Sequence, residues 1–298
     1  MRWWCVAVDE PWSWTPRPYL GVWVLCLGLA VAYALSVRRR RRAVSGDPAG
    51  AQDVVSGRQV LWFVLGVVFL WVASDWPVGS LGAGYLASIH MLQYMLYTLA
   101  AAPLLLLGTP EWMFERLLRR THLRGVVGAL SRPLVAAVLF NVVLIATHAP
   151  VTVDTLRTTQ VGNFTLDMIW LGSGFLLWLP VVSPVREFRA RSAAARIVYL
   201  FCAAALIPMI PGGFVAFSPQ PLYGTYELAP RLGPEGPSAL GDQQFAGVLM
   251  KVGNVPIIWA VMAVIWFRWY DAEQRSSRRR REVRNLVPSG TAPPGTAE

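Results

Sequence analysis

Seven long apolar stretches alternate with polar segments along this 298-residue chain. Each stretch approaches the length of about 20 residues that an α-helix needs to cross the hydrocarbon core of a bilayer. The stretches predict transmembrane helices over residues 19–37, 59–73, 85–107, 133–148, 163–185, 197–215 and 243–267. The pattern therefore predicts an all-α, polytopic membrane protein with about seven spans.

The composition supports lipid as the main solvent of the chain, because only 15% of its residues are charged. A soluble domain carries about 25%. No internal repeat is evident, and we expect three parts. The sequence predicts a tryptophan-rich interfacial segment over residues 1–18 and the seven-span domain over residues 19–270. It predicts a basic tail over residues 271–298, which is expected to be disordered from about Ser276.

The net charge of +10 comes almost entirely from arginine, and Lys251 is the single lysine. Arginines follow the first, third, fifth and seventh stretches, within residues 38–42, 116–132, 186–196 and 268–284. Because cytoplasmic loops are enriched in arginine, this alternation predicts an outer N-terminus and a cytoplasmic C-terminus. It also argues against nucleic-acid binding. Residues 111–132, where arginines interleave with aromatic residues, predict an amphipathic helix on the membrane surface.

The usual signatures of enzymes are missing from the sequence. It contains no glycine-rich nucleotide motif, P-loop, HExxH or GxSxG, each of which has a known chemical role. The three cysteines are far apart and form no CxxC pair, which argues against a zinc site. We therefore expect no enzymatic activity, although Asp167 and His90 form a candidate acid–base pair for a membrane enzyme.

Polar residues gather near the predicted outer ends of the spans. With a helix rise of 1.5 Å per residue, Asp167, His90 and Lys251 lie roughly 6, 8 and 12 Å below those ends. His148 ends the fourth span, and the last span opens with Asp242, Gln243 and Gln244. Ionisable residues inside a membrane are costly and usually face the bundle interior, so this outer layer is the predicted functional site.

The same layer contains candidate ligands for a soft metal. Met91 and Met250 lie at similar depth to His90 and His148, and thioether and imidazole groups suit copper(I). These four residues are the candidate copper ligands. Each also has a simpler interpretation, since methionines often pack in cores and His148 could be an interfacial residue at a helix end.

Three segments resemble the CtaG-type assembly factors of cytochrome c oxidase. They are His90-Met91-Leu92-Gln93, Thr147-His148-Ala149-Pro150 and the DQQFAGVLM run at residues 242–250, which is the most specific. The similarity covers about residues 61–270. It implies a seven-span protein of the bacterial plasma membrane that helps to mature haem–copper oxidases. Copper, oxidase subunits and membrane lipids are the partners that it implies, and it indicates no oligomeric state.

The chain departs from the family pattern at the positions that would bind a metal. Tyr94 stands where the family has a second histidine, and Asn163 and Asp167 replace a histidine-rich stretch. Lys251 follows the DQQFAGVLM run where an apolar residue is expected. A fixed ammonium could balance the layer without a metal. We therefore hypothesise a diverged member whose copper site is weakened or lost, with an Asp167–Lys251 ion pair in its place.

The leading interpretation is a non-enzymatic assembly factor for cytochrome c oxidase. It would handle or place copper, or scaffold the subunit that receives copper, from the outer polar layer. The alternative is a membrane transporter for copper or a small solute. Pro208 and the Pro-Gly-Gly run at residues 211–213 favour this alternative, because interrupted helices line transport sites.

Overall fold

The structure is a computed structural model that describes residues 2–44 and 54–286, with side chains described as far as residue 280. The described residues form helices and connecting segments and contain no strand. Among the described residues, six helices are long and apolar enough to cross a membrane, and a bent helix pair gives a seventh if its two helices count as one span. The prediction of an all-helical polytopic membrane protein is confirmed.

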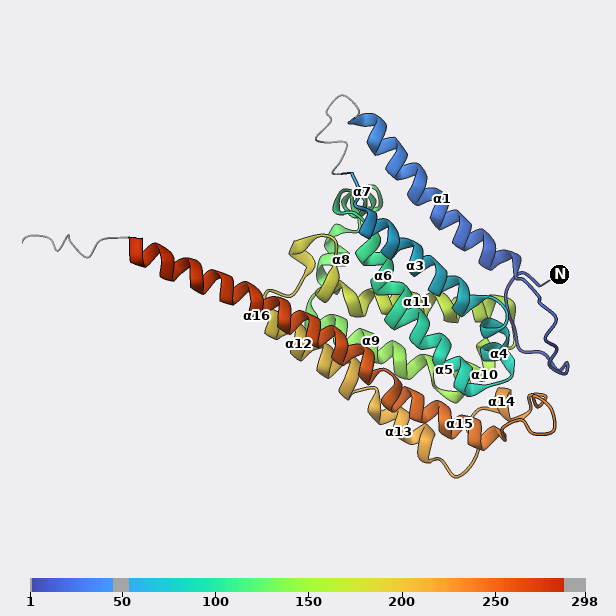
Figure 1. Ribbon diagram of the computed structural model, residues 1–298. Helices are drawn as coiled ribbons and strands as arrows, with labels where there is room; N and C mark the ends of the chain where they lie inside the picture. The colour runs from blue at the N-terminus through green and yellow to red at the C-terminus, as the bar shows by residue number, and fades with distance from the viewer. Residues whose placement is uncertain (1, 45–53, 287–298) are drawn as a thin grey trace, which may run out of the picture.

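The membrane-spanning helices follow the predicted stretches closely (Figure 1). In chain order the spans are α1 (Leu20–Ala43), α3 (Gly57–Ser74), α5–η1–α6 (Ala87–Met95, Leu96–Ala101, Ala102–Gly108), α8–α9 (Arg124–Leu130, Pro133–Thr147), α11 (Gln160–Val182), α12–η3–α13 (Ala193–Leu200, Phe201–Leu206, Met209–Phe217) and α15–η4–α16 (Ala239–Val248, Leu249–Gly253, Val255–Leu286). The fourth is the bent pair, with an angle of 82° between α8 and α9. α9 alone spans about 22 Å, which is shorter than the hydrocarbon core of about 30 Å.

Two groups of short helices lie at opposite ends of the bundle, and one of these groups is rich in arginine (Figure 1). The short helices α4 (Val78–Gly84), α10 (Pro150–Leu156) and α14 (Gly224–Glu227) lie at the end that also holds the N-terminal segment, which we call the site end. α7 (Glu111–Thr121), α8 and η2 (Arg186–Phe188) lie at the other end, which we call the arginine end. The expected orientation, with the site end outside the cell, stays a prediction.

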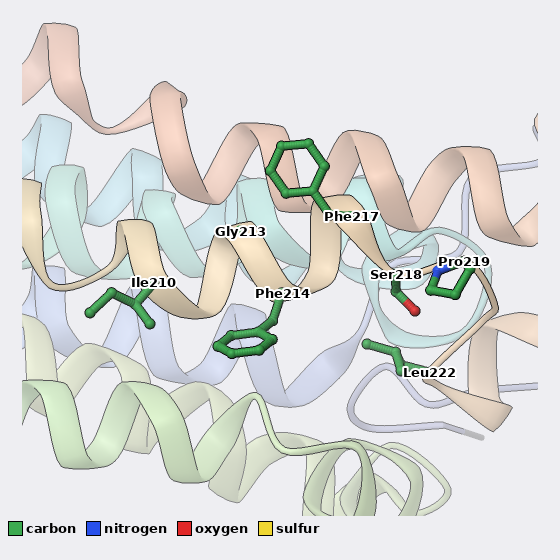
Figure 2. A pocket seen from close by; sticks show the side chains of 7 residues that line it. All are labelled: Ile210, Gly213, Phe214, Phe217, Ser218, Pro219 and Leu222. Atoms are coloured by element: carbon green, nitrogen blue, oxygen red, sulfur yellow. The ribbon is translucent and has the colours of Figure 1, made fainter.

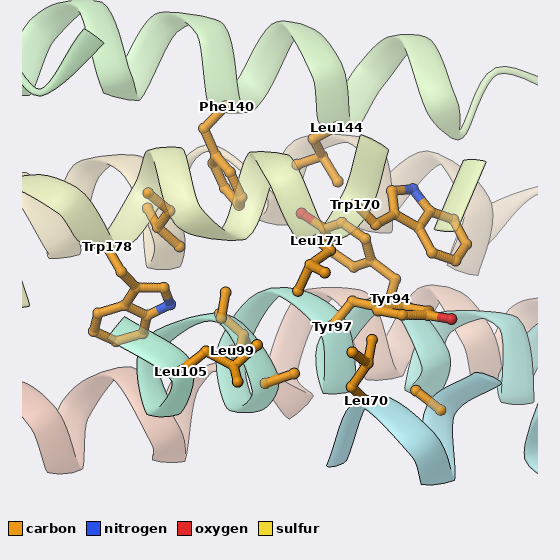
Figure 3. Close-up of a cluster of buried hydrophobic side chains, with 14 of the residues drawn as sticks. Leu70, Tyr94, Tyr97, Leu99, Leu105, Phe140, Leu144, Trp170, Leu171 and Trp178 are labelled. Atoms are coloured by element: carbon orange, nitrogen blue, oxygen red, sulfur yellow. The ribbon is translucent and has the colours of Figure 1, made fainter. Parts of the chain in front are cut away.

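The third and fifth spans form the centre of the bundle. They are 67% and 61% buried over their most apolar windows, whereas the first and last spans are each 22% buried. Trp170 and Trp178 of α11 are almost completely buried, and the Trp170 ring lies 6.1 Å from that of Tyr97 in the third span (Figure 3). The Trp178 indole donates a hydrogen bond to the Thr98 carbonyl (2.8 Å). Polar groups that lie between these two spans are therefore shielded from water and lipid.

Glycines allow α3 to approach the third span closely. A Cβ atom placed on Gly108 would lie 2.3 Å from the Phe63 nitrogen, and one on Gly66 would lie 2.9 Å from the Leu105 nitrogen. Small residues at helix contacts bring backbones together and so replace the hydrophobic effect, which is weak between helices in lipid. The two glycines thus determine the distance between α3 and α6.

Two local predictions differ from the structure. The predicted surface helix over residues 111–132 is two helices, because His122 adopts the left-handed conformation (φ 56°) and ends α7. Histidine is among the residues that enter this region more readily than most. The sixth span is also less interrupted than Pro208 suggested, since Pro208 only caps α13 and the span passes through a π-helical segment.

The predicted tail is partly helical. α16 continues past the last apolar residues to Leu286, so residues 271–286 extend the span as helix. Arginine and glutamate are good helix formers, and they extend a helix that has already begun. Residues 287–298, and residues 45–53 of the first predicted cytoplasmic loop, lie outside the described part of the chain.

The contact between α3 and α6 predicts a position-specific effect on stability. A Gly108→Leu substitution should destabilise the protein by about 1–3 kcal/mol, because the added side chain meets the Phe63 backbone, which cannot move aside. The thermal unfolding midpoint in detergent, followed by tryptophan fluorescence, should fall. Gly28→Leu is the matched control, since a Cβ on Gly28 meets no atom within 4 Å. Equal midpoints for the two variants would contradict the proposed packing.

Candidate functional site

The site end contains a buried cluster of polar side chains. They come from four separate parts of the fold: α5, α11, the segment that follows α10, and α14. We call this cluster the Arg157 network. Its members are His90, Gln93, Arg157, Asn163, Asp167 and Tyr226, each of which has 3% or less of its surface exposed.

Arg157 lies at the centre of this network. It directly follows α10, and its side chain has no exposed surface. One terminal nitrogen, Nη1, donates to the Asn163 side-chain oxygen and lies 3.7 Å from Asp167 Oδ1. The other, Nη2, donates to His90 Nδ1 (2.8 Å) and to Gln93 Oε1 (3.3 Å). A guanidinium presents five donors in a fixed plane, so it can join these side chains at once.

Two further contacts surround the Arg157–Asp167 pair. The Arg157 guanidinium lies 5.0 Å from the centre of a Trp170 ring, which is a cation–π distance. The Trp4 indole donates to Asp167 Oδ2 (2.8 Å), and so brings the N-terminal segment onto the pair. Removing one partner of such a buried pair costs about 3–5 kcal/mol, because an uncompensated charge remains in the interior.

The hypothesised pair between Asp167 and Lys251 does not form. Asp167 has Arg157 as its cation, while the Lys251 ammonium lies 5.1 Å from the centre of the Phe217 ring. That the two residues lie at similar depth stays a prediction. They point to different surroundings, because α11 is central whereas the last span packs against α13 at the periphery.

His90 uses its Nδ1 atom within the network. Arginine can only donate hydrogen bonds, so His90 Nδ1 is an acceptor and carries no proton. The Tyr226 hydroxyl lies 2.7 Å from the same nitrogen and 2.7 Å from the Gly82 carbonyl. Burial raises the pKa of Tyr226 and keeps this hydroxyl protonated. The Nδ1 lone pair of His90 is therefore engaged by protein groups.

His148 lies next to this network with one ring nitrogen unengaged. Its Nδ1 donates to the Leu144 carbonyl (2.8 Å), so the neutral ring has its lone pair on Nε2. Among the described residues, neither His148 Nε2 nor the Tyr94 hydroxyl has a hydrogen-bond partner. The two rings are in edge contact (4.8 Å between centres). The His148 ring also stacks on Trp170, with 5.6 Å between centres.

The candidate methionine ligands are buried but are not arranged as a metal site by any described contact. Met91 and Met250 are 2% and 4% exposed. Met250 and Tyr94 line a cavity of about 20 Å³, which has room for about one water molecule. No group of three or more His, Cys, Asp or Glu side chains in the described part of the chain could hold a metal ion.

The polar residues that open the last span support the framework of the site. Asp242 accepts hydrogen bonds from the Ala87 nitrogen (2.6 Å) and from the nitrogen and hydroxyl of Ser88. Its carboxylate thus caps the first turn of α5, where a negative charge is favourable. Gln243 and Gln244 bind backbone groups of residues 218–222. These three residues position α5 and α14 rather than join the Arg157 network.

Sequence reasoning missed Arg157, Gln93, Tyr226 and Trp4 as members or neighbours of the network. One signal for Arg157 is present in the sequence. It is the only basic residue of the predicted outer loop over residues 149–162, and arginines are less frequent in outer loops. The helix rise gives a depth only for residues within a span, so it does not locate a loop residue that folds inward. Asn163, which the resemblance implies replaces a histidine, accepts a hydrogen bond from Arg157 in the structure.

The fold and the site define a polytopic helical membrane protein with a charged, water-excluded layer at one end. The chain belongs to the cytochrome c oxidase caa3 assembly factor family (Caa3_CtaG), whose model matches residues 31–272. The predicted family and the role in oxidase assembly are thereby confirmed. Comparisons with curated proteins and with solved structures gave no match.

The Arg157–Asp167 pair predicts coupled effects on stability. Arg157→Met should destabilise the protein by about 3–5 kcal/mol, because it leaves a buried carboxylate without its cation. Adding Asp167→Asn should recover part of the loss, which a double-mutant cycle of unfolding midpoints in detergent would measure. Lys251→Met combined with Asp167→Asn is the control and should be additive. Additive losses for Arg157 and Asp167 would mean that the pair contributes nothing.

Proposed function

We propose that this oxidase assembly factor works as a scaffold for an oxidase subunit, and that it does not bind copper at His90. The observation that carries the proposal is the 2.8 Å contact between the Arg157 guanidinium and His90 Nδ1. This contact uses the lone pair of His90 and places a permanent positive charge beside it. The family role in cytochrome c oxidase assembly is the starting point.

Electrostatics disfavours a second cation in this layer. Two unit positive charges 4 Å apart repel each other by about 4 kcal/mol at an effective dielectric constant of 20. The single carboxylate close to Arg157, that of Asp167, already compensates the guanidinium. A copper ion at His90 would have to displace Arg157 and would then leave Arg157, Asn163 and Gln93 without their hydrogen bonds.

The remaining donor atoms are a poor set for copper(I). Soft copper prefers imidazole, thioether and thiolate ligands. His148 Nε2 is an unengaged imidazole nitrogen, but its unpartnered neighbour is the Tyr94 phenol. Tyr94, Asn163 and Asp167 occupy the positions where the family pattern has further histidines. The residues therefore fit a hydrogen-bonded layer better than a copper site.

The site end offers apolar anchors for a partner subunit. Leu228, which follows α14, is 84% exposed, and Trp14 of the N-terminal segment is 69% exposed. Both lie outside the helices that are long and apolar enough to span a membrane. Aromatic anchors such as Trp14 are typical of binding hot spots. We propose that these anchors contact the oxidase subunit, while the Arg157 network makes the surface beneath them rigid.

Copper content and subunit capture distinguish the scaffold from a copper carrier. The purified parent should hold substoichiometric copper after loading with copper(I) and dialysis, and it should retain oxidase subunits from its host membrane. A combined Trp14→Glu and Leu228→Glu variant should lose most of the captured subunits, by roughly tenfold or more. A 1.4 kcal/mol loss at the interface corresponds to a tenfold loss in affinity.

Leu117→Glu is the control for the added charge, because Leu117 is 56% exposed on α7 at the arginine end. It should leave subunit capture unchanged. One equivalent of copper in the parent that disappears in a combined His90→Ala and His148→Ala variant would contradict the proposal and favour copper handling. The structure adds no support for a transporter, since the sixth span continues through Pro208.

A further inference from the structure

Lys251 is a charged residue inside the last membrane span, in η4 between α15 and α16. Its ammonium lies 5.1 Å from the centre of the Phe217 ring. No carboxylate in the described part of the chain lies within salt-bridge distance of it. A cation–π contact offsets only part of the cost of an ammonium in hydrocarbon. The position therefore calls for an anion that the described chain does not provide.

The Lys251 side chain lies against α13, between Gly212 and the ring of Phe217. A Cβ on Gly212 would lie 3.3 Å from Lys251 Cα, so Lys251 begins beside Gly212. The ring that its ammonium reaches belongs to Phe217, the last residue of α13. Gly212 and Phe217 are separated by about 8 Å of helix rise. Lysine side chains extend in this way toward a membrane interface, which brings the ammonium toward the level of lipid headgroups.

An apolar groove lies along α13 and shares one residue, Phe217, with the surroundings of this charge (Figure 2). It has a volume of about 570 Å³ and is lined by Ile210, Gly213, Phe214, Phe217, Ser218, Pro219 and Leu222. Phe214 and Phe217 are 75% and 77% exposed. Figure 2 shows the Phe217 ring directed toward the neighbouring last span, and Ile210 and Phe214 directed to other sides of α13. Phe217 thus belongs both to the groove and to the surroundings of Lys251.

We propose that this groove binds a phospholipid with a net negative headgroup, with the phosphate on Lys251 and an acyl chain along Ile210, Phe214 and Leu222. The size of the groove favours a lipid over a partner helix. A helix about 10 Å wide fills roughly 400 Å³ per turn, so the groove would seat little more than one turn. An acyl chain is thinner and needs no polar partners along its length.

The charge of the site selects the headgroup. Lys251 is the one lysine of the chain, and the nearest acidic residue on its own helix, Asp242, is engaged by Ala87 and Ser88. An ammonium without a carboxylate attracts a phosphate most strongly when no choline compensates that phosphate. The site is therefore independent of the Arg157 network and of the proposed scaffold role.

Lipid retention by the detergent-purified full chain tests the site. Native mass spectrometry should show phosphatidylglycerol bound at roughly ten times the level of phosphatidylcholine at equal concentrations. Lys251→Met should reduce phosphatidylglycerol to the phosphatidylcholine level, and Lys251→Arg should restore it. Diacylglycerol, which has the chains without the phosphate, and glycerol phosphate, which has the phosphate without the chains, should each bind much more weakly.

A groove-filling variant gives a second readout. A Cβ on Gly213 meets no atom within 4 Å, so Gly213→Leu should fold normally while it fills the groove and lowers phosphatidylglycerol retention several-fold. Gly172→Leu, which is equally unhindered on α11, is the matched control and should bind like the parent. Retention that is equal for both lipids, or unchanged in Lys251→Met, would overturn the proposal. The proposal would also be overturned if the purified protein retained no lipid and instead captured an oxidase subunit that the Lys251→Met variant fails to capture.

Discussion

The Arg157 guanidinium carries a permanent charge at a position with no exposed surface, and the site end is organised around compensating it. Removing an ion from water costs several kilocalories per mole even after relaxation. Asp167 supplies the opposite charge, while Asn163, His90 and Gln93 accept the hydrogen bonds of the guanidinium. Spans three and five therefore meet the segment after α10 in one arrangement. Any other arrangement would leave a charge inside the membrane domain without its partner.

The same requirement explains why the segments outside the spans are well packed. The Ala7 nitrogen donates to the Arg157 carbonyl (3.0 Å), and the Gln160 side chain accepts from the nitrogens of Trp3 and Trp4. α14 contributes Tyr226 to His90. These contacts cover the charged layer with backbone and indole groups. The N-terminal segment and α14 are thus parts of the site, although they lie outside the membrane helices.

The resemblance seen in the sequence implies histidines at positions 94, 163 and 167. This chain has Tyr94, Asn163 and Asp167 there, and the last two contact Arg157. An arginine with a carboxylate and an amide can occupy a polar site without a metal, although Arg157 Nε and Asp167 Oδ1 have no hydrogen-bond partner among the described residues. Lys251 lies outside this arrangement, with its ammonium 5.1 Å from the centre of the Phe217 ring of α13.

The sequence by itself predicts the spans, the polar layer and the family, because hydropathy and the order of motifs depend only on the order of residues along the chain. It predicts that His90, His148, Asp167 and Lys251 lie near the same end of their spans. Only the tertiary structure decided which of them meet. The direction of a side chain around its helix depends on which neighbours the helix packs against, and the inward fold of the segment carrying Arg157 depends on long-range contacts. Asp167 therefore meets Arg157 rather than Lys251, since a loop that packs against α11 brings its charge closer than a residue on a peripheral span does.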